Sequence, residues 1–187
     1  MRRRNRDSDW CGGSKRRATK VWILVTISIV AFIVTAVAME QTGKVQVEPI
    51  IGSWKMNVSA SKISPTLQDV FKIAAPKQRT EVYRQISGGR IELKGTFTGI
   101  DSSSYSYSKT FPAEGGMGQY ENSDPSESDV NTRISPREWY VTAMQNGKQT
   151  LTIHKIISED GKTMQQTVTS VDSKGKPFEE LRIFERQ

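Results

Sequence analysis

The chain has 187 residues, a length typical of one domain, and a formal net charge of +7. The basic excess is confined to the N-terminus, where the first twenty residues carry eight Arg or Lys against two Asp, while the rest of the chain carries 19 basic and 18 acidic residues. Nucleic-acid-binding domains concentrate basic residues in their folded part. The sequence therefore predicts that this protein does not bind nucleic acid.

The N-terminal region consists of a basic tail, residues 1–20, and an apolar run, residues 21–38. The run reads VWILVTISIVAFIVTAVA and contains no charge, Gly or Pro. As a helix it would be about 27 Å long, close to the hydrocarbon thickness of a bilayer. We expect a transmembrane segment rather than a buried core helix. Because cations precede it, the N-terminus is predicted to be cytoplasmic and the C-terminal domain periplasmic or extracellular.

Two fates of the apolar run stay open. Its last residues, Ala36-Val37-Ala38, fit the small-x-small pattern of a signal-peptidase site, so the domain could be secreted after cleavage near Ala38. The long basic leader favours an uncleaved signal-anchor, which makes the chain a single-pass membrane protein. Cys11, the single cysteine, lies before the run, so the exported part contains no thiol and can form no disulfide.

Residues 39–50 are predicted to be a linker and residues 51–187 a β domain. Segments rich in Val, Ile, Thr and aromatic residues alternate with Gly-containing turns such as Asn146-Gly147, the usual hairpin signals. The predicted strands are Ile51–Val58, Arg79–Ser87, Arg90–Gly99, Ser104–Phe111, Gly118–Asn122, Asp129–Ile134, Glu138–Gln145, Gln149–Ser158, Thr163–Val171 and Phe178–Glu185. One short helix is expected over Pro65–Ile73, with Ser64 as its N-cap.

Many short antiparallel strands must protect two sheet edges, either by closing into a barrel or by stacking into a sandwich. Consecutive hairpins predict a meander and nothing indicates a parallel sheet. The predicted fold class is mainly β, an antiparallel up-and-down β-barrel of about 8–10 strands. The Pro112–Ser128 stretch is rich in Gly, Ser and acidic residues and is expected to contain a mobile loop or an edge hairpin.

The first and last strands carry the motifs GSWKMN, from Gly52, and LRIFERQ, ending at Gln187. This pair resembles the calycin superfamily of lipocalins and fatty-acid-binding proteins, and it is most similar to short secreted bacterial lipocalin-like domains of unassigned activity. The resemblance implies a barrel whose first and last strands adjoin. It also implies that Gly52, Trp54, Arg182 and Arg186 contribute to structural closure at one end.

The same resemblance implies candidate ligand contacts. Arg182 matches an arginine that grips a ligand carboxylate in fatty-acid-binding proteins, and Phe184 replaces the tyrosine that assists it there. Arg182 could equally stack on Trp54, a role that Arg186 could take instead because alternate strand residues share a face. Tyr107 and Trp139 are aromatic residues typical of a core and are further candidate contacts.

The predicted function is a membrane-tethered or secreted lipocalin-like binding module for a small hydrophobic ligand, with or without a carboxylate. The domain has one histidine, His154, and no recognisable nucleophile elbow, phosphate loop or metal cluster, so we expect no enzyme, catalytic residue, metal or cofactor. The alternative is a non-enzymatic structural or protein-interaction module with a filled core. Its loops near Pro112–Ser128 would then contact a partner.

Overall fold

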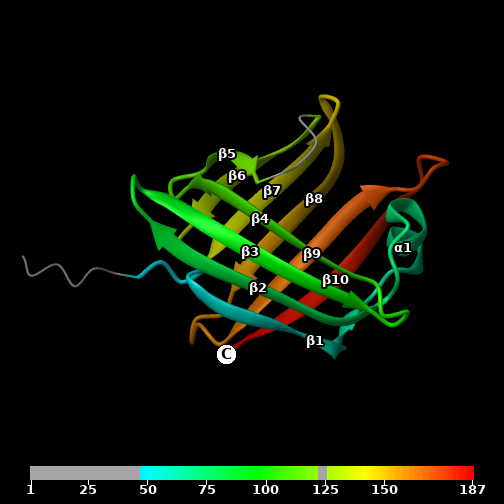
Figure 1. Cartoon of the computed structure of the whole chain (residues 1–187), viewed down its shortest axis with the longest axis horizontal. Coiled ribbons are helices and arrows are strands. Elements are labelled where there is room, and N and C mark those ends of the chain that lie inside the picture. The colour runs from blue at the N-terminus through cyan, green and yellow to red at the C-terminus, as the bar shows by residue number, and fades with distance from the viewer. Residues whose placement is uncertain (1–46, 122–125) are drawn as a thin grey trace, which may run out of the picture. The chain divides into compact units, whose positions relative to one another are not determined.

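The computed structural model describes residues 47–121 and 126–187, which belong to one compact unit, Gly43–Gln187 (Figure 1). The predicted basic tail and transmembrane segment, residues 1–20 and 21–38, lie outside the described residues. Among the helices of the described part, none has the length and apolarity needed to span a bilayer.

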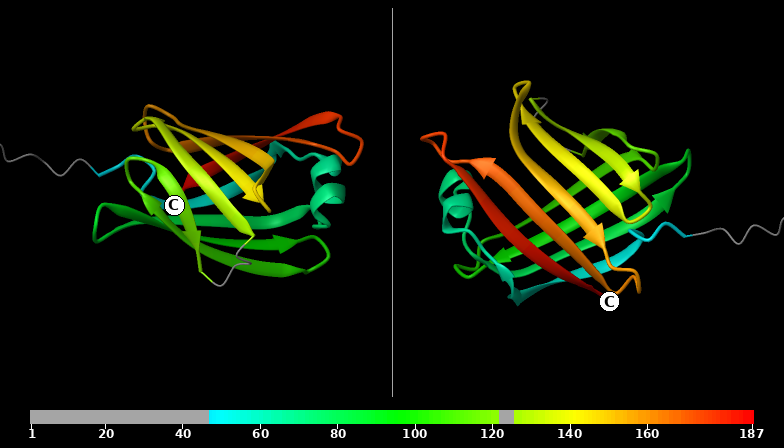
Figure 2. Two further views of the ribbon diagram at one scale, coloured as in Figure 1. Left: turned by 90° about the horizontal axis from the view of Figure 1, so that it is seen from above. Right: turned by 180° about the vertical axis from the view of Figure 1, so that it is seen from behind.

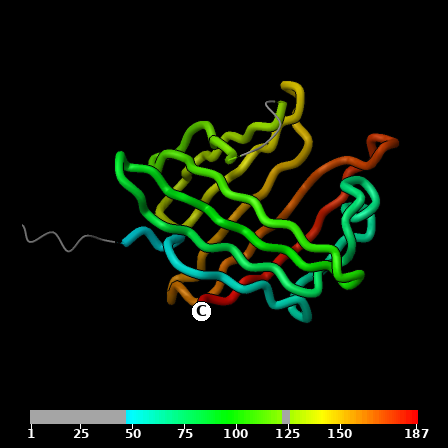
Figure 3. Tube along the Cα trace, viewed as in Figure 1, coloured from blue at the N-terminus to red at the C-terminus, as the bar shows by residue number. Residues whose placement is uncertain are grey.

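Ten antiparallel strands form a closed barrel, and one helix lies after the first strand (Figures 1 and 3). Each strand pairs with its neighbours in sequence, and β1 also pairs with β10, so the described sheet has no free edge. The mainly β prediction and the up-and-down barrel are confirmed. The elements are β1 Gly52–Lys62, α1 Pro65–Phe71, β2 Pro76–Ile86, β3 Arg90–Gly99, β4 Ser104–Pro112, β5 Gly116–Tyr120, β6 Glu127–Ser135, β7 Glu138–Gln145, β8 Lys148–Ile157, β9 Thr163–Val171 and β10 Pro177–Arg186.

The first and last strands adjoin in the register that places Trp54 opposite Arg186 and Met56 opposite Phe184. Sandwich stacking, the other arrangement open to the sequence, is therefore not adopted. Asn146 and Gly147 both have positive φ, 52° and 73°, as the tight turn between β7 and β8 requires. The chain thus closes a cylinder with short connections between most strands.

The helix α1 is shorter than predicted and is capped differently. It ends at Phe71, where Lys72 takes a left-handed conformation, and the Ser64 side chain makes no capping hydrogen bond. The Ser64 backbone N–H instead donates to Glu180 of β10, 3.0 Å away. Leu67 is the buried residue of this helix. Figure 2 shows α1 at the end of the barrel away from the C-terminus.

Large apolar side chains fill the opposite end of the barrel, which we call the closed end. Its core comprises Ile50, Trp54, Met56, Tyr83, Ile91, Leu93, Phe111, Ala113, Trp139, Ile157, Met164 and Phe184. These residues come from the start of β1, the end of β2, the start of β3 and the matching halves of later strands. Removing them from water supplies the main stabilising contribution to the fold.

Candidate functional site

A cavity of about 240 Å³ lies inside the barrel above the closed-end core. It is larger than the roughly 150 Å³ apolar cavity that accommodates benzene in an engineered protein. Its lining comes from seven strands: Arg79 and Glu81 of β2, Leu93 of β3, Tyr105, Tyr107 and Lys109 of β4, Tyr120 of β5, Asp129 of β6, Val141 and Ala143 of β7, and Leu151, Ile153 and Lys155 of β8. The cavity therefore has room for a molecule larger than a benzene ring.

One wall of this cavity is aliphatic. Val141 and Ala143 alternate along β7, and Leu151 and Ile153 alternate along the neighbouring β8. Alternate residues of a strand point to the same face, so all four side chains enter the barrel. This wall offers an apolar surface for a ring or a short hydrocarbon chain.

The opposite part of the lining is built around the Glu81 carboxylate, which is 1% exposed. It accepts hydrogen bonds from the Tyr83 hydroxyl at 2.6 Å and from Gln166 Nε2 at 2.8 Å. Arg79 Nη2 lies 3.1 Å and Lys155 Nζ 3.6 Å from its oxygens. One buried carboxylate thus pairs with two cations from different strands.

A second polar cluster surrounds Asp129, which is fully buried. Lys109 Nζ forms an ion pair with this carboxylate, the Tyr120 hydroxyl donates to it at 2.8 Å, and Asn131 Nδ2 donates at 2.7 Å. The three donors satisfy Asp129 inside the barrel, as a buried charge requires.

The charged groups shift one another's pKa values. Burial alone would raise the pKa of the Glu81 carboxyl, but the adjacent Lys155 and Arg79 cations outweigh it and hold that pKa well below its usual range. Burial lowers the pKa of Lys155 to about 8, with Glu81 opposing the shift and the Lys109 and Arg79 charges adding to it. At neutral pH Glu81 is ionised and Lys155 is largely protonated.

The charges that line the cavity do not balance. Among the residues that line the cavity, Arg79, Lys109 and Lys155 face the carboxylates Glu81 and Asp129, an excess of one positive charge. A buried cation without its own partner is costly, and a ligand anion would offset that cost.

Two glycines make room for the clusters around Glu81 and Asp129, which together we call the polar layer. A Cβ built on Gly95 would lie 2.1 Å from Cζ of Tyr107, its partner across the β3–β4 pair, and one on Gly118 would lie 1.9 Å from the Asp129 carboxylate. Both contacts are far inside van der Waals distance. The Tyr107 ring and the Asp129 side chain thus occupy positions that only a missing side chain leaves open.

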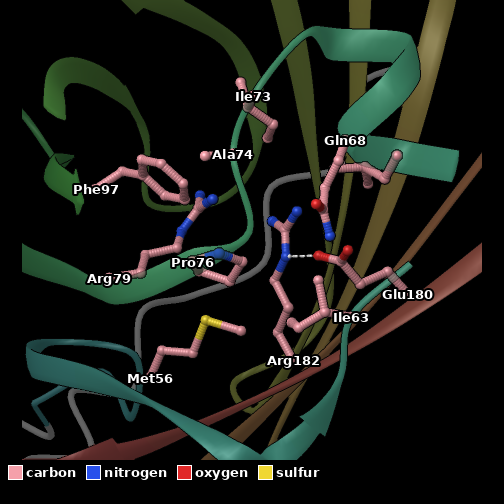
Figure 4. A pocket seen from close by; sticks show the side chains of 11 residues that line it. Met56, Ile63, Gln68, Ile73, Ala74, Pro76, Arg79, Phe97, Glu180 and Arg182 are labelled. Carbon is pink, nitrogen blue, oxygen red and sulfur yellow. Dashed lines mark hydrogen bonds and ion pairs between the residues drawn. The ribbon is translucent and has the colours of Figure 1, made fainter. Parts of the chain in front are cut away.

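A second, much smaller pocket of about 10 Å³ lies beneath α1 and has room for about one water molecule (Figure 4). Arg182 extends into it and donates from Nε to Glu180 at 2.5 Å. Figure 4 shows the Arg79 guanidinium group reaching into the same pocket beside Phe97. Burial lowers the pKa of Arg182, and the nearby Arg79 charge adds to this effect.

The four candidate ligand contacts from the sequence fall in three places. Tyr107 lines the larger cavity, where its hydroxyl lies 3.1 Å from Glu81. Arg182 lines the small pocket. Trp139 and Phe184 belong to the closed-end core, where Trp139 packs edge-on against Phe111. The candidates are separated because inward-pointing residues at different positions along their strands reach different parts of the barrel interior: the cavity, the small pocket or the closed-end core.

Arg186, rather than Arg182, lies over the Trp54 ring, with the guanidinium carbon 4.2 Å from the ring centroid. Its guanidinium donates to the carbonyls of Gly161 and Ile51, each at 2.6 Å, and to that of Pro49. A Cβ on Gly52 would lie 2.4 Å from Arg186 Nη1, so the glycine is needed for this packing. Arg182 lies four residues earlier on β10, where it lines the small pocket and is held by Glu180.

The charged lining residues Glu81, Lys109 and Lys155 were not among the candidates from the sequence. A signal for Lys155 exists: the inward positions of β8 are Leu151, Ile153, Lys155 and Ile157, so a cation interrupts an apolar face. His154 points outward, stacked on Tyr140 at 4.2 Å and 2.9 Å from Glu138. Within residues 47–121 and 126–187, no group of three or more His, Cys, Asp or Glu is placed to bind a metal ion.

Comparison with protein-family models and with curated proteins gave no match. Solved structures do match. The fluorescent protein UnaG superposes with a TM-score of 0.51 and 16% identity, over 75% of this chain and 99% of that one. The zebrafish ileal bile acid-binding protein in complex with cholic acid gives 0.43 and 10%, over 74% and 99%. The chain has the fold of the calycin β-barrels, as its first- and last-strand motifs predicted.

Proposed function

We propose that the barrel binds a small, partly apolar molecule that carries a carboxylate. The observation that carries the proposal is the 240 Å³ cavity, in which an aliphatic wall faces a polar layer with one excess positive charge. The apolar part of the ligand would pack on Val141, Ala143, Leu151 and Ile153. Its carboxylate would lie near Lys155 and Arg79, where charge-assisted hydrogen bonds are strongest.

The test is a calorimetric titration of the full chain with 2-naphthoate and with 2-naphthalenemethanol, which has the same ring system without the charge. We expect 2-naphthoate to bind more tightly. Its affinity should fall as the pH rises through about 8, because Lys155 then loses the proton that attracts the anion. Equal affinity of both compounds would refute the role of the charge.

The alternative, a protein-interaction module with a filled interior, makes a different prediction. It expects neither compound to bind at any pH. The existence of the cavity is the observation that favours ligand binding over this alternative, since a barrel filled by its own side chains leaves no such space.

We also propose that residues 21–38 tether the barrel to a membrane, with the barrel on the side opposite the basic tail. The apolar run and the preceding cations support this proposal. Protease treatment tests it, because the barrel should be digested once the outer face of this membrane is accessible, without opening the membrane itself. Recovery of a soluble chain beginning just after Ala38 would instead support secretion after cleavage.

A further inference from the structure

Lys155 differs in its surroundings from an ordinary surface lysine. Its side chain is 5% exposed, yet it lines the 240 Å³ cavity and can contact a molecule bound there. Nζ donates a hydrogen bond to the Tyr83 hydroxyl at 2.6 Å, and that hydroxyl donates onward to Glu81. The amine is therefore fixed by a hydrogen-bond chain in the polar layer of the cavity.

Burial and two neighbouring cations favour loss of the Lys155 proton, while the Glu81 carboxylate opposes it. Arg79 and Lys109 are cations of the same lining, and each carries its own carboxylate contact, to Glu81 and Asp129. Lys155 shares Glu81 with Arg79 at the longer distance of 3.6 Å. A lysine that is desolvated and close to other cations is the arrangement that produces a nucleophilic amine.

From this geometry we propose that Lys155 forms an imine with an aldehyde-bearing apolar molecule bound in the cavity. The inference rests on the proposed ligand-binding function of the same cavity and adds a covalent mode for carbonyl compounds. The aliphatic wall from β7 and β8 would hold the hydrocarbon part, which places the carbonyl carbon at the polar layer.

The reaction is a condensation without redox change. After the ammonium of Lys155 releases one proton to water, the lone pair of Nζ attacks the carbonyl carbon, a C–N bond forms, and the carbonyl π pair moves to oxygen. A proton passes from nitrogen to that oxygen to give a carbinolamine. Protonation of the hydroxyl group then expels one water molecule, and the nitrogen lone pair forms the C=N bond.

The neutral amine is abundant enough for this step. With a pKa of about 8, the neutral fraction of Lys155 at about pH 7.5 exceeds that of an unperturbed lysine by roughly a hundredfold. Lys148 lies on the same strand, is exposed, and serves as the matched lysine for comparison. We expect Lys155 to be labelled faster than Lys148.

The experiment incubates the full chain with 2-naphthaldehyde and sodium cyanoborohydride, which reduces an imine to a stable secondary amine. Peptide mapping by mass spectrometry then locates the adduct. We expect one adduct per chain at Lys155, its loss in Lys155→Arg, and its retention in Lys148→Arg. Excess 2-naphthoate should slow labelling, since it occupies the same cavity. Peptide mapping on the chain without substitutions locates the adduct even if Lys155→Arg fails to fold.

The outcomes separate this inference from the proposed function. Tight binding of 2-naphthoate with no adduct at Lys155, or with labelling equal to that of Lys148, overturns the imine and leaves the binding proposal standing. If 2-naphthoate does not bind and 2-naphthaldehyde does not react, both the binding proposal and the imine are overturned. Labelling of Lys155 that 2-naphthoate does not slow also overturns the inference, because the amine would then react outside the proposed cavity.

Discussion

Arg186→Ala tests how the barrel is closed. In the folded state this guanidinium lies 4.2 Å from the Trp54 ring centroid and donates to the backbone carbonyls of Gly161, Ile51 and Pro49. These carbonyls belong to the segment before β1 and to the turn between β8 and β9. One side chain therefore joins the start of the domain to two later parts of it.

The size of the effect follows from these contacts. The cation–π contact contributes about 1 kcal/mol. Each hydrogen bond from a charged donor contributes about 1.5–3 kcal/mol when its acceptor is left unpaired, but water can reach a half-buried site and replace much of this. We expect Arg186→Ala to lower the free energy of unfolding by about 3 kcal/mol in total, which corresponds to a fall in Tm of roughly 10 °C for a domain of this size.

The assay is thermal and urea unfolding of the full chain, followed by tryptophan fluorescence and circular dichroism. Arg186→Lys is the informative comparison, because it keeps the charge over Trp54 but loses the planar guanidinium group that donates to three carbonyls. We expect it to recover less than half of the lost stability. A loss below about 1 kcal/mol in Arg186→Ala would refute the reasoning, since that is the value of one ordinary exposed contact.

Three further predictions concern the cavity. Lys155→Met should weaken 2-naphthoate binding about tenfold or more and remove its pH dependence near 8, whereas Lys148→Met should change neither, as measured by calorimetry across pH. Ala143→Phe adds a ring to the aliphatic wall and should abolish binding of 2-naphthoate with a small change in Tm; unchanged affinity would mean that the ligand binds elsewhere. Gly95→Ala should displace the Tyr107 ring and destabilise the fold by about 1–3 kcal/mol in urea unfolding, whereas Ser106→Ala on the exposed face should be neutral.

Much of the architecture could be predicted because its signals are local. Period-two alternation and Gly-containing turns located ten strands, several of them to the residue: the predicted ranges Arg90–Gly99, Glu138–Gln145 and Thr163–Val171 equal the observed ones. The helix prediction was correct in place but two residues too long. Ser64 was a wrong prediction as a side-chain cap, because its backbone N–H is instead held by Glu180 from a strand far along the chain.

The closure motif was also readable in sequence, but its assignment to individual residues was not. Arg182 and Arg186 share a strand face and both could reach the closed end in principle. The β1–β10 register decides between them, because it sets Arg186 opposite Trp54 and leaves Arg182 beside Glu180. A register is a property of two paired strands and cannot be read from either alone.

By itself the sequence located the strands and their meander order, since these depend on side-chain period and turn chemistry along the chain. The meeting of the two ends was implied by the resemblance of the first- and last-strand motifs to calycin barrels. Only the tertiary structure decided the site. Glu81 is held by Gln166, 85 residues later, and Lys155 reaches Tyr83 across 72 residues. Such contacts, and the space beside them, exist only once closure of the barrel brings non-neighbouring strands face to face across a common interior.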